Sequence, residues 1–524
     1  MSFSTTAVLA LPSDARTLFI TRSFRLFAYG SLGVLLVLYL KTLGLRDDDI
    51  GYFLTITLLG DSLVSLFVTG NADRMGRRFF LCLGAVLMAI TGFVFAAYPT
   101  FTTFDEWFPH DGDKKPDPKF DLEGWKGWIF YLGLVVVGTV GVLSPSGNEV
   151  GPFVALETSI LAKFVRFDSR ATVFAWYSLI GSFSTALGSL FAGLIVSHLT
   201  ESSFFSSYFS IAMVAESPAS LHIPKRRSDT SVVVAITEQD LLTKIAAYRI
   251  VIAIYGVVGL VLTVLFWRLS LDVEPSVSLD LSRLSDAHSV VQSPQEESTP
   301  LLGMSSASAR VEPSLLMRLL TTVLPGLNFA RETRWTVVKL SLLFTLDSFG
   351  TSIMTGSMLA YWFSWKYGVD EAYLGEVLFV SNILAGISSL VAGYVSGRIG
   401  LVKTMVFTHL PANILMLSVP FMPNLFWATA LLFLRATISQ MDVGPRQAYI
   451  SSIVPSNDRT AAMGIINTLR SLGAAFGPFV TGYLAETGRF DYAFIACGGL
   501  TILYDLLLLW NFGGSRGAPL RTDS

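Results

Sequence analysis

Charged side chains occur inside stretches of the chain that are otherwise apolar and about 20 residues long. The clearest cases are four residues: Arg25, Asp61, Asp347 and Arg435. A charge in the hydrocarbon of a bilayer costs several kcal/mol, so it needs a partner or a function. Arginine stays charged in a pocket and can bind a carboxylate or phosphate through two hydrogen bonds. A buried carboxylate can take up and release a proton. The pattern therefore predicts a site for an anionic solute and a proton.

Asp347, near the middle of its stretch, is the first candidate for the proton carrier. The alternative is structural, because the buried charges could pair with one another, for example Asp347 with Arg25 or with Arg435, and only hold helices together. We favour a functional role for the set as a whole, since a bundle rarely needs so many buried charges. His409 is a further candidate because histidine titrates near neutral pH. The commoner role of a lone histidine is packing, here with a hydrogen bond to Asn413.

The composition requires a membrane around these residues. Of the 524 residues, 52% are hydrophobic and only 15% are charged, whereas soluble proteins carry about 25% charged residues. A net charge of −2 argues against a nucleic-acid partner. Cys82 and Cys497 lie far apart and indicate neither a disulfide nor a zinc site. We find no phosphate-binding glycine loop and no nucleophile motif, so the sequence predicts neither a cofactor nor an enzyme.

The apolar stretches predict twelve membrane-spanning helices. Arginine and lysine gather in the short loops on one side, which places those loops and both termini in the cytoplasm. The loop 200–244 opposes this topology with Lys225, Arg226 and Arg227, but a loop of this length has less influence on orientation. The predicted spans are 18–40, 50–70, 79–98, 127–146, 172–199, 245–269, 336–360, 373–396, 404–422, 425–442, 460–486 and 490–511.

A short basic turn joins the second and third spans. It reads Gly70-Asn-Ala-Asp73-Arg74-Met-Gly76-Arg77-Arg78. This pattern resembles the loop between helices 2 and 3 of the major facilitator superfamily, a family of secondary transporters. The resemblance implies two pseudo-symmetric six-helix bundles that alternately open a central cavity to either side of the membrane. It also implies that spans 1, 4, 7 and 10 face the cavity, which would place there Arg25, Glu149, Asp347, Arg435 and Asp442.

Two features repeat between the halves of the chain. Asn148-Glu-Val-Gly-Pro152 after span 4 matches Met441-Asp-Val-Gly-Pro445 after span 10, and Gly397-Arg-Ile-Gly400 echoes the turn at Asp73-Arg-Met-Gly76. A duplicated six-helix unit explains both matches. We therefore predict an N-terminal bundle at 1–270, a largely disordered cytoplasmic linker at 271–335 and a C-terminal bundle at 336–524.

Acidic residues at the ends of the even-numbered spans predict gates. Glu149 and Asp442 each precede a Gly-Pro pair and a span that starts with an arginine, Arg170 and Arg459 respectively. Such acid–base pairs could close the cytoplasmic face while the outer face is open. The alternative is that each carboxylate caps the next helix, which is worth only about 0.5–2 kcal/mol. By resemblance to the family loop, the gating set also includes Asp73, Arg74 and Arg77.

These observations predict a proton-coupled transporter of a small solute, with an organic anion or metabolite favoured by the arginines. Span 5 lacks the Gly-Pro motif of the family's antiporters, which leaves import and export of drugs or metabolites open. A solute-sensing receptor would use the linker as its signalling element. The expected partners are the solute, protons and the bilayer, and the protein is expected to be a monomer. Glu297-Ser-Thr-Pro-Leu-Leu302 resembles an acidic dileucine signal, which would direct the protein to a vacuolar or lysosomal membrane rather than the plasma membrane.

Overall fold

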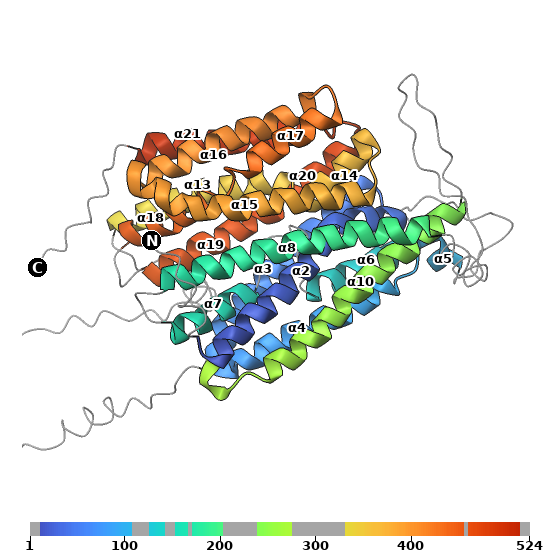
Figure 1. The fold of residues 1–524 in the computed structure, drawn as a ribbon, viewed down its shortest axis with the longest axis horizontal. Helices are drawn as coiled ribbons and strands as arrows, with labels where there is room; N and C mark the ends of the chain where they lie inside the picture. The colour runs from blue at the N-terminus through green and yellow to red at the C-terminus, as the bar shows by residue number, and fades with distance from the viewer. Residues whose placement is uncertain are drawn as a thin grey trace, which may run out of the picture.

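The computed structural model describes residues 11–106, 125–141, 152–165, 170–202, 238–274, 331–454 and 459–513. These residues form helices joined by short turns. In Figure 1, helices α2 to α10 form one group, coloured blue to green, and helices α13 to α21 form a second, coloured yellow to red. The two groups lie side by side along their lengths. Most of the linker at 271–335, including the dileucine-like segment, lies outside the described residues.

The first half of the chain contributes the helices of the first group. They are α2 (Ser13–Thr42), α3 (Asp47–Met75), α4 (Arg77–Ala96), α5 (Phe101–Glu106), α6 (Trp125–Val140), α7 (Pro152–Phe164), α8 (Arg170–Glu201), α10 (Glu238–Trp267) and the 3-10 helix η2 (Leu271–Val273).

The second group comes from the second half of the chain. It contains α13 (Arg331–Ile353), α14 (Gly356–Tyr367), α15 (Glu371–Ile399), α16 (Leu401–Ser418), the 3-10 helix η4 (Val419–Phe421), α17 (Leu425–Ala436), α18 (Val443–Ile453), α19 (Arg459–Ala475), α20 (Gly477–Glu486) and α21 (Tyr492–Phe512). Gly76 joins α3 to α4 with φ 104°, and Gly400 joins α15 to α16 with φ 91°. A left-handed conformation that favours glycine thus occurs at corresponding turns of the two halves.

The predicted all-helical membrane fold is confirmed. Nine segments of the described chain are long and apolar enough to cross a membrane. Of the other three predicted spans, 460–486 is divided into α19 and α20. The predicted spans 127–146 and 425–442 contain only α6 and α17, and the further helices α7 and α18 lie beyond their predicted ends. Helix α18 is too polar to be recognised by hydropathy, whereas α7 is as apolar as α15 but only 13 residues long.

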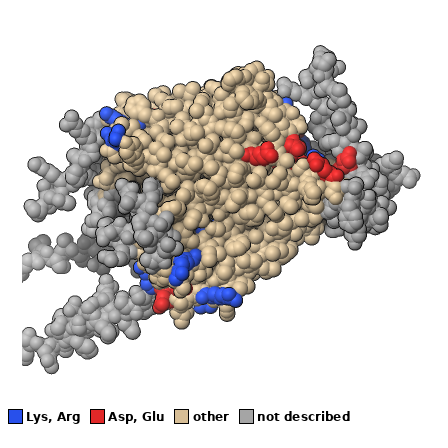
Figure 2. All heavy atoms as spheres, in the orientation of Figure 1, with Lys and Arg blue, Asp and Glu red and all other residues tan. Residues whose placement is uncertain are grey.

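On the face shown in Figure 2, positive and negative side chains lie mostly at opposite ends of the molecule. Lys and Arg gather mostly at the end where α7, α18 and the start of α19 lie, and Asp and Glu gather mostly at the opposite end. A broad uncharged band separates them, as a membrane-embedded surface requires. The basic end is the one predicted to face the cytoplasm, and we call it the inner end.

The two halves pack closely at the outer end and part towards the inner end. Four glycines of α15 lie within about 40° of one another around the helix, given its 3.6 residues per turn. From the outer to the inner end they are Gly375, Gly386, Gly393 and Gly397. The first two abut α8 so closely that a Cβ atom would overlap it, whereas no described atom lies within 4 Å of such an atom at the last two. One face of α15 thus leaves α8 as it runs inward.

Candidate functional site

Helices α2 and α7 of the first half are joined by a buried ion pair. Arg25 donates a hydrogen bond to Glu157, and their side chains are 1% and 0% exposed. Glu157 also accepts hydrogen bonds from the Tyr177 hydroxyl at 2.5 Å and from the Thr21 hydroxyl at 3.4 Å. The Arg25 guanidinium lies 4.8 Å from the centroid of the Phe153 ring. Both carboxylate oxygens of Glu157 are therefore satisfied, as a buried charge requires.

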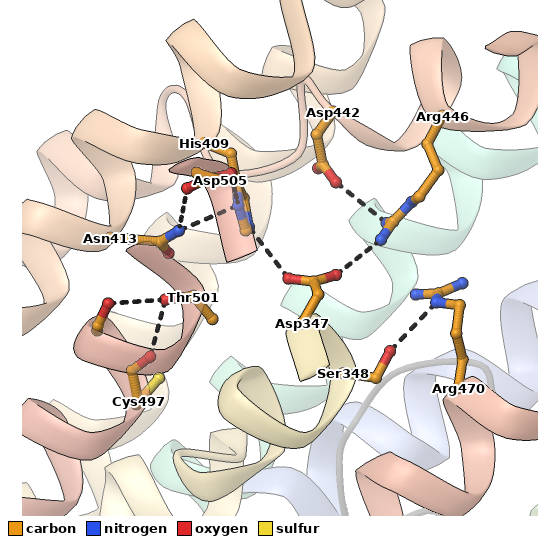
Figure 3. Close-up of polar contacts among 11 residues, drawn as sticks. Asp347, Ser348, His409, Asn413, Asp442, Arg446, Arg470, Cys497, Thr501 and Asp505 are labelled. Atoms are coloured by element: carbon orange, nitrogen blue, oxygen red, sulfur yellow. Dashed lines mark hydrogen bonds and ion pairs between the residues drawn. The ribbon is translucent and has the colours of Figure 1, made fainter. Parts of the chain in front are cut away.

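The second half has an ion pair of opposite polarity between spans 7 and 10. Arg446 of α18 donates from Nη1 to Asp347 Oδ2 of α13 at 2.9 Å. Its Nη2 lies 3.1 Å from Asp442 Oδ2. Figure 3 shows Arg446 between the two carboxylates. All three side chains are buried. Through these contacts Arg446 links α13 of span 7 to the start of α18 in span 10.

A histidine extends this cluster to α16 and α21. His409 Nδ1 lies 3.0 Å from Asp505 Oδ1, and His409 Nε2 lies 3.8 Å from Asp347 Oδ1. Asn413 Nδ2 donates to Asp505 Oδ2 at 2.9 Å and lies 3.0 Å from His409 Nδ1. The imidazole therefore stands between two carboxylates (Figure 3).

Arg470 of α19 adds a second guanidinium group beside the cluster. Its Nε donates to Ser348 Oγ at 3.1 Å, and Figure 3 places the group next to Asp347 and Arg446. We call the set Asp347, His409, Asp442, Arg446, Arg470 and Asp505 the C-half cluster.

Asp61 and Arg435 carry buried polar atoms and have no side-chain partner among the described residues. Asp61 of α3 is 1% exposed, and neither of its carboxylate oxygens accepts a hydrogen bond. Arg435 lies in the last turn of α17, its Nε is buried without a hydrogen bond, and its side chain forms no ion pair with the described part of the chain. An arginine cannot discharge itself by losing its proton, so Arg435 needs a counter-charge from elsewhere.

Arg435 stands at a break in span 10. Helix α17 ends at Ala436, and six residues, 437–442, form turns before α18 begins. The Gln440 N–H donates to Ser388 Oγ of α15 at 3.3 Å instead of to a carbonyl of its own helix. Broken helices at the middle of a membrane are typical of solute sites in transporters, because unwound backbone and helix ends offer polar groups there.

The predicted gate residues lie in different places. Asp442 is not at the cytoplasmic end of span 10 but inside the bundle, 4% exposed, because α18 continues the span. Arg74 is exposed on α3, and the backbone N–H of Arg77 donates to the Glu274 carboxylate at 2.7 Å. Three others lie in helices with their side chains outside the described set: Asp73, Arg170 and Arg459. Glu149 lies outside the described residues.

In the structural alternative that the sequence offered, Asp347 forms an ion pair with Arg25 or Arg435, and these partners are wrong. Asp347 contacts Arg446 and His409 rather than Arg25 or Arg435, and Arg25 contacts Glu157. Glu157 and Arg446 were missed because each lies in a half-helix that reads as a loop. The signal that could have found them is positional, since each follows the repeated Gly-Pro pair by at most five residues.

Ion pairs also join the two halves at the outer end. Lys244 of α10 lies 3.1 Å from Glu371 of α15, and the Tyr248 hydroxyl donates to the same carboxylate at 2.6 Å. Arg46, just before α3, lies 3.2 Å from Glu486 of α20. The pKa of Arg46 is raised, because the carboxylates of Asp48 and Glu486 outweigh the lowering effect of burial. We call Lys244, Glu371, Arg46 and Glu486 the outer clamp.

Comparison with known proteins identifies the family to which these helices belong. The chain matches the family model of the Major Facilitator Superfamily over residues 18–441 and 340–523. It is 25% identical over 504 residues to the uncharacterized membrane protein YJR124C of Saccharomyces cerevisiae, covering 96% of this chain and 94% of that protein. A local match of 28% identity over 137 residues, 26% of this chain and 34% of the relative, is to the multi-drug resistance efflux pump PmrA of Streptococcus pneumoniae.

Solved structures show the same fold. The inward open conformation of the xylose transporter XylE from E. coli has a TM-score of 0.58 at 14% identity, covering 96% of this chain and 97% of that one. The nucleoside transporter NupG has a TM-score of 0.58 at 11% identity, covering 96% and 100%.

Proposed function

Because the chain belongs to the major facilitator superfamily, we propose that it is a secondary transporter that moves a small organic anion by alternating access and is driven by protons. The protein is an integral, multi-pass membrane protein. Its two bundles, 1–270 and 336–524, rock about the central site, and the segment 271–335 links them on the cytoplasmic side. The conformation described here opens inward, since the outer clamp is formed and α15 parts from α8 at the inner end.

The unpartnered guanidinium of Arg435 is the observation that carries the choice of an anion. The side chain is half-buried, its Nε is enclosed without a hydrogen bond, and arginine stays protonated in any environment. A negative charge beside it would stabilise the guanidinium group, and we assign that charge to the solute. A carboxylate or phosphate fits, because either can accept two hydrogen bonds from the planar group.

Proton coupling is supported by Asp61. An ionised carboxylate buried without any partner would cost several kcal/mol, so in this conformation Asp61 carries a proton. The opposite conformation would have to hydrate Asp61 for the proton to leave, and that requirement ties proton movement to the transport cycle. Asp347 and His409 are the corresponding groups in the second half.

The protein acts as a monomer in a vacuolar or lysosomal membrane or in the plasma membrane. A vacuolar or lysosomal location would follow from the dileucine-like segment Glu297–Leu302. Export of drugs is the second candidate function, and the local likeness to a multi-drug efflux pump favours it.

Uptake into proteoliposomes tests the proposal. Vesicles with an imposed pH gradient would be offered radiolabelled lactate, succinate, citrate, glycerol phosphate, glucose and a cationic dye. We expect gradient-driven accumulation of one of the anions, and a loss of at least about tenfold in Arg435→Gln, because one charge-assisted contact is worth about 1.5–3 kcal/mol. The matched control is Arg249→Gln, which removes an arginine that donates to the Tyr98 carbonyl at 2.7 Å, far from the break.

Three outcomes would count against this function. Accumulation of only the dye would favour drug export. Accumulation of only glucose would reject the anion. Anion uptake that Arg435→Gln leaves unchanged would remove Arg435 from the site. Asp347→Asn and Asp61→Asn would be measured with and without the pH gradient. A residue that carries the driving proton is needed for uptake against a concentration gradient but not for exchange of solute at equal pH. Loss of the first activity alone therefore separates proton coupling from solute binding.

A further inference from the structure

The C-half cluster contains more negative than positive fixed charge. Its three carboxylates face two guanidinium groups, those of Arg446 and Arg470, and one imidazole. The groups come from five helices: α13, α16, α18, α19 and α21. In a buried site an uncompensated charge costs several kcal/mol. The cluster is neutral only if it holds one additional proton.

The distances show which group can take up this proton. His409 Nδ1 and Asp505 Oδ1 are 3.0 Å apart, and both would be acceptors without a hydrogen between them. Two facing lone pairs at that distance repel each other, so a hydrogen lies between the ring and the carboxylate, and the Nδ1–H of a neutral imidazole supplies it. The additional proton then converts the ring to an imidazolium, which Asp505 stabilises. Asn413 holds the other oxygen of Asp505 at 2.9 Å, which fixes the carboxylate against the ring.

The contact of His409 with Asp347 is of a different kind. At 3.8 Å from Nε2 to Oδ1 it is too long for a hydrogen bond, and Asp347 Oδ1 has no other hydrogen-bond partner in the described part of the chain. Its Oδ2 accepts from Arg446 at 2.9 Å. The positive charge of the imidazolium therefore attracts the Asp347 carboxylate, as Arg446 does from the other side. When His409 loses its proton, the attraction from Arg446 remains.

The contacts described around the ion pair of the first half are of a different kind. Glu157, the carboxylate between spans 1 and 4, has its oxygens satisfied by Arg25, Tyr177 and Thr21. None of these partners titrates near neutral pH. Among the contacts of the described residues, it is the second ion pair that meets a histidine.

We propose that His409 of α16 and Asp505 of α21 form a proton-binding site outside the central helices of the C-terminal half, and that Asp347 transmits its occupancy to Arg446 of α18. This inference rests on the proposed proton coupling and locates it. The proton is held by two peripheral helices, whereas the solute is held at the break in span 10. Proton and solute therefore meet through α18 rather than in one pocket.

The scheme includes each charged or titratable group that faces His409 in the described part of the chain. They are Asp347 on α13, Asp442 and Arg446 at the start of α18, Arg470 on α19, and Tyr504 and Asp505 on α21. The Tyr504 ring centroid lies 5.8 Å from that of His409. Arginine and tyrosine do not change charge between about pH 5 and pH 8. The change of charge proposed here belongs to the hydrogen-bonded pair of His409 and Asp505.

Nitrogen NMR of histidine tests the site without any solute. The full-length protein, labelled with 15N-histidine in nanodiscs, contains five histidines. His409→Gln assigns the His409 signal, and His198→Gln, at an exposed position near the end of α8, is the control. The probe is the proton itself, titrated from about pH 5 to pH 9.

We expect the His409 signals to titrate, and the midpoint in Asp505→Asn to lie at least about one pH unit below that of the wild type, because the facing carboxylate is lost. Asp505→Glu should restore most of the difference. Asp347→Asn should shift the midpoint less, since its contact is 3.8 Å rather than 3.0 Å. If Asp505→Asn fails to fold, the wild-type Nδ1 signal still shows whether a hydrogen lies between the two groups.

The inference would be overturned by a His409 signal that does not titrate, or by a midpoint that Asp505→Asn leaves in place. A structural role for Asp505 alone would lower the yield of folded protein without moving the midpoint. Failure of the proposed function looks different. The site would titrate as expected, but wild-type proteoliposomes would not accumulate any anion on a pH gradient.

Discussion

Two buried ion pairs at related positions have different partners and therefore different roles. The Arg25–Glu157 pair is enclosed and both oxygens of Glu157 accept hydrogen bonds, whereas the Asp347–Arg446 pair touches an imidazole. We interpret the first as a fixed brace between α2 and α7. Breaking a buried pair by removing one partner leaves the other charge uncompensated, which costs about 3–5 kcal/mol.

Glu157→Gln should therefore destabilise the protein by about 3–5 kcal/mol. The double substitution Arg25→Met with Glu157→Met should be much less harmful, because it removes both charges and keeps the volume. A thiol-reactive dye can report the thermal transition, since Cys497 is buried and becomes reactive on unfolding. Glu376→Gln, at an exposed position on α15, is the control. A single variant as stable as this control would show that Glu157 does not brace the helices.

The sequence predicted the buried charges better than their partners. Arg25, Asp61 and Asp347 stand out because each interrupts an apolar stretch, and all three are buried in the structure. Arg446 does not stand out, because its neighbours are polar as well, and Glu157 was missed because its short apolar segment was read as part of a loop. Hydropathy measures contact with lipid, and a helix surrounded by protein has no need to be apolar. The pairing of charges also depends on tertiary packing, which residue type alone does not encode.

At the scale of elements, the glycine face of α15 is the feature with a direct consequence. At Gly375 a Cβ atom would lie 2.7 Å from the Ser189 carbonyl oxygen and 3.0 Å from the Gly193 Cα of α8. At Gly393, on the same face, no described atom lies within 4 Å. The two positions therefore report on the two ends of one helix contact. If the halves rock, the inner glycines should pack against α8 when the outer ones separate.

Gly375→Val should prevent the outer ends of α8 and α15 from approaching, and so shift the protein towards an outward-open form. Gly393→Val should leave the outer ends closed, because its side chain has room in the present conformation. Spin labels on the outer ends of the two helices would report the distance between them by pulsed electron resonance. Equal distances in the two variants would contradict the rocking of α15 against α8.

The locations of most helices followed from the sequence, and the interruptions did not. Long apolar stretches identify α2, α4 and α21 directly. The break in span 10 was read as the end of a helix, because a Gly-Pro pair usually terminates one. What allows the chain to resume as a helix is a set of contacts from other spans, such as that of Ser388 with Gln440. Such contacts are set by the fold and leave no local pattern.

At the scale of the whole molecule, the outer clamp decides which side of the membrane the site faces. Lys244 and Glu371 belong to different halves and are 36% and 7% exposed. Because the lysine is partly in water, we assign the pair only about 1 kcal/mol. That energy still changes the ratio of two conformations roughly fivefold, since 1.4 kcal/mol corresponds to a factor of ten.

Glu371→Lys should open the outer end, because it places two lysines opposite each other and removes the acceptor of the Tyr248 hydroxyl. The exchange of charges, Lys244→Glu with Glu371→Lys, should restore much of the closed population. Labelling of a cysteine introduced at the outer end by a membrane-impermeant reagent would measure the open fraction in the three proteins. Raising the salt concentration should narrow the differences, because an exposed pair is screened. If the exchange labels as fast as Glu371→Lys alone, attraction across this interface does not hold the halves together, and the outer closure must depend on the glycine contact of α8 with α15.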